Sequence, residues 1–229
     1  MAILFDIDET LIDHGAALRQ AVATLYQTVA VEAPLEAFAQ TWDEALRRWF
    51  DRYLAGEITY EEQRRARVRE TVDAQLSDTD ADRIFAGYLS TYEANWTLFP
   101  DVLPTLDRLA AYPLGIVSNG QTAQQRLKLE RMGIARRFRA VVISEDCGYA
   151  KPRAEIFHMG CALLDEPPSR CVHVGDLYDV DAMGARQAGL TGVWLDRQGT
   201  AADVHERPVI RSLADLPAVM RLHEERRKS

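Results

Sequence analysis

Short apolar runs alternate with helical stretches from residue 101 to the end of the chain, and this alternation restricts the fold more than any other feature. The apolar runs occupy residues 114–119, 140–144, 171–176, 193–195 and 209–210. Helical periodicity fills residues 101–111, 122–132, 153–164, 179–188 and 213–226. Strands that alternate with helices and contain β-branched residues are typical of a doubly wound parallel sheet. The sequence therefore predicts an α/β fold with a mostly parallel sheet.

The first residues of the chain supply another strand of that sheet. Residues 2–5 read Ala-Ile-Leu-Phe and lead directly into Asp6, which is the composition of a buried parallel strand. Residues 15–96 then show helical periodicity and no convincing strand. Since the sheet pattern resumes only after this stretch, we predict that a helical domain interrupts the α/β domain. The predicted boundaries are 1–14 and 97–229 for the α/β core and 15–96 for the all-helical insertion.

Two local signals mark helix starts inside the insertion. Pro34 suits the first turn of a helix that continues to about residue 54, because its missing N–H is not needed there. Thr59 and Glu62 have the spacing of a capping box, in which each side chain accepts a hydrogen bond from the backbone N–H of the other residue. A further helix is therefore expected to begin directly after Thr59.

Composition limits the classes of partner. The chain has 229 residues and a formal net charge of -8, and an acidic protein repels the phosphate backbone of nucleic acids. No apolar run approaches the length of a membrane span, and no basic leader precedes the first strand. The three cysteines lack metal-ligand spacing and favour a reducing compartment. We expect a cytoplasmic protein that binds neither nucleic acid nor membranes.

Polar side chains follow the predicted strands at the point where each strand ends. Ligands of open parallel sheets bind at this carboxyl edge, and the acids at i and i+2 after the first strand point to the same side. Neighbouring carboxylates repel each other unless a cation or a proton compensates. Acids, a hydroxyl group and a lysine together suit a hard cation and a phosphate group. The residues are Asp6 and Asp8, Ser118 and Asn119, Lys151, and Asp176 with Asp179 and Asp181.

Four short motifs occur in a fixed order along the chain. They are D-x-D-x-T at residues 6–10, S-N-G at 118–120, K-P at 151–152 and G-D-x-x-x-x-D at 175–181. In this order the motifs resemble those of the haloacid-dehalogenase-like (HAD) superfamily, and the resemblance extends over essentially the whole chain. It implies a Rossmann-like core. The helical insertion is similar to the cap domain that some members carry between the first and second motifs.

The resemblance implies a role for each acid. Asp6 would be the nucleophile that forms an aspartyl-phosphate. Asp8 would donate a proton to the leaving alcohol and later take one from the water that hydrolyses the intermediate. The implied metal is Mg²⁺, which prefers oxygen ligands. Its ligands would be the carboxylates of Asp6 and Asp176 and the backbone carbonyl of Asp8, with Asp181 in an outer or water-mediated position.

The remaining motif residues are expected to bind the phosphoryl group. Ser118 and the backbone N–H of Asn119 would contact phosphoryl oxygens, and Lys151 would pair with the nucleophile and with the transferring group. Lys151 is one of only three lysines among 27 basic residues, which makes its place in a motif more suggestive. The alternatives are a solvated loop cation for Lys151 and a helix cap for Ser118. His173, inside an apolar run, is expected to be a buried structural histidine.

These expectations favour a phosphatase that acts on a small phosphorylated metabolite such as a nucleotide, a sugar phosphate or a phosphoglycolate-like acid. Asp8 disfavours a haloacid dehalogenase, since displacement of a halide needs no acid for the leaving group. The absence of lysine from residues 15–96 excludes the phosphonate-cleaving chemistry that uses a cap lysine. A phosphomutase stays an alternative, although Glu9-Thr10 favours hydrolysis. A non-catalytic binding protein on the same fold is another, and the chain could be a monomer or a homodimer.

Overall fold

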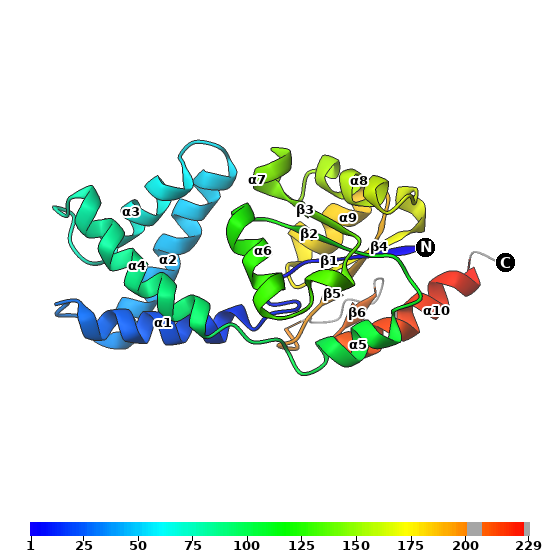
Figure 1. Ribbon diagram of the computed structural model, residues 1–229, viewed down its shortest axis with the longest axis horizontal. Coiled ribbons are helices and arrows are strands. Elements are labelled where there is room, and N and C mark those ends of the chain that lie inside the picture. The colour runs from blue at the N-terminus through cyan, green and yellow to red at the C-terminus, as the bar shows by residue number, and fades with distance from the viewer. Residues whose placement is uncertain (201–207, 227–229) are drawn as a thin grey trace. The chain divides into compact units, whose positions relative to one another are not determined.

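The computed structural model describes residues 1–200 and 208–226, and the chain divides into two compact units. The sheet unit contains Met1–Asp13 and the chain from Leu98 onward, and the helical unit contains His14–Thr97 (Figure 1). The chain leaves the sheet unit after Asp13 and re-enters it at Leu98, and the residues next to these two points pair with each other. There Ile12 and Leu98 form an antiparallel bridge, and the Phe99 N–H donates to the Leu11 carbonyl at 3.1 Å.

Four helices form the helical unit: α1 (His14–Thr28), α2 (Leu35–Leu54), α3 (Tyr60–Thr71) and α4 (Asp78–Ala94). The predicted capping box is confirmed, because the Thr59 hydroxyl accepts from the Glu62 N–H at 3.1 Å and the Glu62 carboxylate accepts from the Thr59 N–H at 2.7 Å. The interior is aromatic: Trp42 on α2 is fully buried and packs at 4.8 Å from the ring of Tyr88 on α4. These contacts give the unit an apolar core of its own.

In the part of the chain that the structure describes, six parallel strands form one sheet in the order β3-β2-β1-β4-β5-β6. This confirms the predicted fold class. The strand order reverses at β1, because β2 and β3 lie on one side of it and β4, β5 and β6 on the other. This is the switch point at which open α/β sheets bind ligands. The strands are β1 (Ala2–Phe5), β2 (Leu114–Ser118), β3 (Ala140–Ile143), β4 (Cys171–Gly175), β5 (Thr191–Leu195) and β6 (Val209–Ile210).

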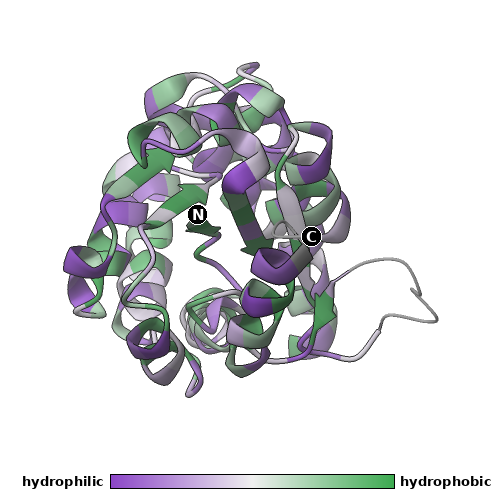
Figure 2. Cartoon of the chain, turned by 90° about the vertical axis from the view of Figure 1, so that its right-hand side faces the viewer, coloured by the Kyte–Doolittle hydropathy of each residue, from purple (hydrophilic) through white to green (hydrophobic). Residues whose placement is uncertain are grey.

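Helices cover both faces of this sheet. They are α5 (Val102–Arg108), α6 (Thr122–Arg131), α7 (Ser144–Cys147), α8 (Ala154–Leu163), α9 (Gly184–Gln187) and α10 (Leu216–Arg226). In Figure 1, α8 and α9 lie on one side of the sheet and α5 and α10 on the other. The strands are mostly apolar, whereas the helices mix apolar and polar residues (Figure 2). Leu4, Val117 and Phe157 are fully buried in one core cluster between the sheet and α8. Within the described ranges, every helix is too short or too polar to span a lipid bilayer.

Two segments differ from the sequence-based expectation. Residues 179–188 were expected to form one helix, but Tyr178–Met183 form a π-helical turn that continues into α9. Such turns occur often at functional sites, and this one carries Asp181. Ser144–Cys147 form one helical turn, α7, directly after β3, and Gly148 ends it with a positive φ of 76°. That left-handed conformation is unstrained in glycine, which explains why so short a helix ends at this residue.

The close approach of the π-helical turn to β5 leads to a stability prediction. A Cβ atom at Gly192 would lie 2.0 Å from the backbone carbonyl oxygen of Ala182, which cannot move without shifting the turn. We expect Gly192→Ala to lower the free energy of unfolding by about 2–3 kcal/mol or more, measured by urea unfolding. Gly87→Ala is the control, because this exposed position in α4 has nothing within 4 Å of the added Cβ. It should raise stability by about 0.5–1 kcal/mol. Equal unfolding midpoints for the two variants would contradict the prediction.

Candidate active site

The loop after β1 holds the first two predicted acids in place. The Asp6 N–H donates to the Val174 carbonyl at 3.0 Å, so Asp6 continues the pairing of β1 with β4. The chain then turns sharply, because the N–H groups of Leu11 and Ile12 both donate to the Ile7 carbonyl at 2.8 and 3.0 Å. The loop therefore presents the side chain of Asp6 at the carboxyl edge of the central strand.

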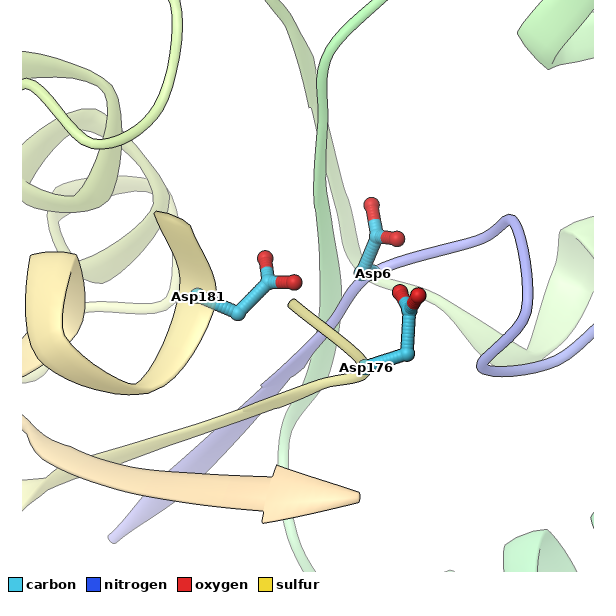
Figure 3. Close-up of side chains that lie close together, drawn as sticks. All are labelled: Asp6, Asp176 and Asp181. Carbon is cyan, nitrogen blue, oxygen red and sulfur yellow. The ribbon is translucent and has the colours of Figure 1, made fainter. Parts of the chain in front are cut away.

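Three of the predicted acids meet at this edge. Ligand atoms of Asp6, Asp176 and Asp181 lie within 4.8 Å of one another. Figure 3 shows the three side chains close together, with Asp6 after β1, Asp176 after β4 and Asp181 on the π-helical turn. Three carboxylates so close together repel one another, and the cluster therefore requires positive charge or protons.

Lys151 supplies positive charge to the cluster. Its Nζ atom lies 2.7 Å from Asp6 Oδ1 and 2.6 Å from Asp181 Oδ1, and the residue is 5% exposed. The side chain of Asn119 holds the Lys151 backbone, since its Oδ1 accepts from the Lys151 N–H at 2.7 Å and its Nδ2 donates to the Lys151 carbonyl at 3.0 Å. Lys151 is therefore not a solvated loop cation, which was the alternative left open by the sequence.

The acids of the cluster have unequal proton affinities. Burial raises the pKa of the Asp6 carboxyl to about 6, although the charge of Lys151 acts in the opposite direction. Burial, with the charges of Asp6 and Asp181, raises the pKa of Asp176 to about 9. Burial alone would raise the pKa of Asp181, but the Lys151 charge and the hydrogen bond from His173 outweigh it and hold this pKa well below its usual value. Negative charge is therefore firmly placed on Asp181 and less firmly on Asp6 and Asp176.

Asp181 is fully engaged by the protein. Its Oδ1 contacts Lys151 Nζ and lies 3.1 Å from His173 Nε2, and its Oδ2 accepts from the Leu177 N–H at 3.0 Å. His173 is buried, as expected, and burial lowers its pKa. Its contact with Asp181 was not foreseen, because the sequence indicated only a structural histidine. Asp179 is exposed and lies outside the acid cluster.

Asp8 belongs to a second cluster in which two residues were not predicted. Lys128 Nζ on α6 lies 2.7 and 2.8 Å from the two carboxylate oxygens of Asp8. Gln125 Nε2, one turn earlier on α6, lies 3.1 Å from Asp8 Oδ2 and 2.9 Å from Ser118 Oγ. Ser118 and Asp8 are thus connected through one amide group. The i, i+3 spacing of Gln125 and Lys128, in a chain poor in lysine, was the only signal in the sequence for this pair.

The raised pKa values lead to a prediction for the metal-free protein. The unfolded chain loses the protons of Asp6 and Asp176 near the ordinary aspartate pKa of 3.8, whereas the folded protein retains them up to about pH 6 and about pH 9, respectively. The folded state then binds more protons than the unfolded state, so stability must fall as the pH rises through this window. With a chelator present, we expect the melting temperature to fall as the pH rises from 3.8 to about 9. Asp176→Asn should flatten the upper part of the fall, and the exposed control Asp179→Asn should not. Identical profiles for wild type and Asp176→Asn would contradict this assignment.

Comparison with known proteins agrees with the fold and the motifs. The pattern of the haloacid dehalogenase-like hydrolases matches residues 1–189. The chain is 31% identical over 210 residues to glyceraldehyde 3-phosphate phosphatase of Methanopyrus kandleri, which covers 90% of this chain and 88% of that protein. It is 28% identical over 226 residues to a pyrimidine 5'-nucleotidase of Escherichia coli, and this alignment covers 97% of this chain and 94% of that protein.

Solved structures give the same result for the fold. A HAD-hydrolase from Bacillus subtilis bound to magnesium superimposes with a TM-score of 0.77 at 22% identity, covering 96% of this chain and 97% of that one. The family match includes β1 to β4, the helical unit and all four motifs. The chain therefore belongs to the haloacid dehalogenase-like hydrolases, and it is a hydrolase.

Proposed function

We propose that the protein is a phosphatase that hydrolyses a small phosphorylated metabolite through an aspartyl-phosphate on Asp6. The observation that carries this proposal is the position of the Asp6 carboxylate at the switch point of the sheet, with one oxygen paired to Lys151. Lys151 offsets part of the negative charge that would otherwise repel a phosphate group. Asp8, two residues further on, supplies a second carboxylate for proton transfer.

The residues divide the reaction into two displacements. A carboxylate oxygen of Asp6 attacks phosphorus, the bond to the leaving oxygen breaks, and Asp8 gives this oxygen a proton. Asp8 then takes a proton from water, whose oxygen attacks the phosphorus of the aspartyl-phosphate and releases inorganic phosphate and free Asp6. Ser118 and the backbone N–H of Asn119 would bind phosphoryl oxygens during both steps. Lys151 would stay paired with the nucleophile and with the transferring group.

The acid cluster fits Mg²⁺. Two of its three carboxylates, Asp6 and Asp181, contact Lys151. The pKa values of Asp6 and Asp176 are raised, so a hard cation would relieve uncompensated negative charge. We assign Asp6, Asp176 and the Asp8 carbonyl as its ligands. Asp181, whose two oxygens already accept hydrogen bonds, is assigned to an outer or water-mediated position. When bound, Mg²⁺ would neutralise charge on the phosphoryl group.

The relatives support a small phosphorylated substrate. Those named above act on a phosphorylated sugar and on nucleotides, so both classes belong in the first test, together with phosphoglycolate-like acids. We propose residues 1–14 and 97–229 as the catalytic core and 15–96 as the cap. The three cysteines are free thiols, which supports a reducing compartment such as the cytoplasm. The proposed partner is the small substrate alone, for a monomer or a homodimer.

Asp6→Asn provides the direct test. The amide keeps the shape of the side chain but is a poor nucleophile, so phosphate release should fall by about 10⁴-fold or more. We would measure release from sugar phosphates, nucleoside monophosphates and phosphoglycolate, with and without Mg²⁺. Asp179→Asn is the matched control, because it makes the same chemical change at an exposed acid outside the acid cluster, and it should keep its activity.

Two results would contradict the proposal in different ways. If the wild type releases phosphate from no phosphoester, the protein is not a phosphatase for these classes, and the dehalogenase, mutase and binding alternatives return. If Asp6→Asn releases phosphate as fast as the wild type, the nucleophile is another residue.

A further inference from the structure

The proposed acid/base residue is held at both of its oxygens by one buried cation. Lys128 Nζ lies 2.7 Å from Asp8 Oδ1 and 2.8 Å from Asp8 Oδ2, although the two residues are 120 positions apart in the chain. Lys128 is 1% exposed, whereas the side chain of Asp8 keeps 26% of its surface accessible. The cation is therefore the buried partner, and the carboxylate is the partner that can reach other molecules.

Stability alone does not account for a lysine at this position. Placing an ammonium group out of water costs free energy that its partner repays only in part, and an apolar residue of similar volume is often as stable or more so. A cation that contacts both oxygens instead restricts the carboxylate to one orientation. Without it, the Asp8 side chain could populate other staggered rotamers.

Gln125 links the ion pair of Lys128 and Asp8 to Ser118, the predicted phosphate-binding residue. Its Nε2 atom lies 3.1 Å from Asp8 Oδ2, 2.9 Å from Ser118 Oγ and 3.3 Å from the Asn119 carbonyl oxygen. Gln125 is itself buried. One face of α6 thus fixes the separation between the carboxylate that would transfer protons and the hydroxyl that would hold the phosphoryl group.

We propose that Lys128 is a positioning residue that, with Gln125, holds the Asp8 carboxylate in the orientation for proton transfer. The proposal rests on the proposed function, because it assigns Lys128 to the reaction through Asp8. Lys128 itself need not touch the substrate. It acts by raising the fraction of molecules in which Asp8 is correctly oriented.

The dependence of the rate on the leaving group tests this role. The ratio kcat/KM reports the steps up to departure of the leaving group. An alkyl phosphate requires a proton for its leaving oxygen, whereas 4-nitrophenolate leaves without one. Lys128→Met should therefore lower kcat/KM for an alkyl phosphate by roughly 10- to 100-fold, and for 4-nitrophenyl phosphate by less than about threefold. For the second substrate, kcat and KM should fall together, because hydrolysis of the aspartyl-phosphate still needs Asp8.

Three further variants complete the experiment. Lys128→Arg keeps a cation that can contact both carboxylate oxygens, and it should recover part of the loss on the alkyl phosphate. Arg126→Met is the matched control, because it removes one positive charge from the same helix at an exposed position, and it should behave as wild type. Gln125→Leu should show the same selective loss in smaller degree. It also serves as the test if Lys128→Met has no cooperative unfolding transition.

The outcomes separate this inference from the proposed function. No turnover of either substrate by the wild type contradicts the proposed function itself. Wild-type turnover, with an equal fall in kcat/KM for both substrates or with no fall for either, overturns the positioning role and leaves the phosphatase proposal intact. A Lys128→Arg variant as impaired as Lys128→Met on the alkyl phosphate would also overturn it. A selective loss that arginine partly restores supports it.

Discussion

The buried contact of Lys151 with two carboxylates is the interaction on which the rest of the site depends. Asp6, Asp176 and Asp181 could not lie within 4.8 Å of one another without a compensating charge. Asp181 keeps its negative charge because Lys151 and His173 face it, and this anion in turn fixes the lysine beside Asp6. The arrangement leaves Asp6 and Asp176 as the acids whose negative charge the protein compensates least, which agrees with our proposal that they bind a cation.

The topology explains how so many polar groups reach one place. β1 lies between β2 and β4, so the segments that follow these strands emerge at the same edge of the sheet. Each segment then has a specific local device. In the loop after β1, two backbone N–H groups donate to the Ile7 carbonyl and close a tight turn. The side chain of Asn119 binds the backbone of Lys151. A π-helical turn places Asp181 near the end of β4. The apolar sheet thus supports a site whose residues lie at strand ends, in loops, on a π-helical turn and on α6.

The sequence predicted the sheet and the main acids because both depend on local signals. Apolar runs, helical periodicity and the capping box at Thr59 are readable within a few residues, and short motifs follow the strand ends. Lys128 was missed because lysine is an ordinary helix former, and its contact with Asp8 joins residues 120 positions apart. The π-helical turn was missed for a related reason. It depends on the close approach of Ala182 to Gly192, which no pattern within residues 178–188 reveals.

The bridge between Ile12 and Leu98 has a consequence for how such a protein can change. The chain leaves the sheet unit and returns to it at two points that are hydrogen-bonded to each other. The segment between these points is a loop with its two ends held together. The free energy needed to bring the ends of a flexible loop together rises by only about 0.6 kcal/mol for each doubling of the loop's length. An insertion of a different size could therefore replace the four helices at little thermodynamic cost to the sheet. The size and sequence of the helical unit can in this way change while the strands and the acids at their ends stay the same.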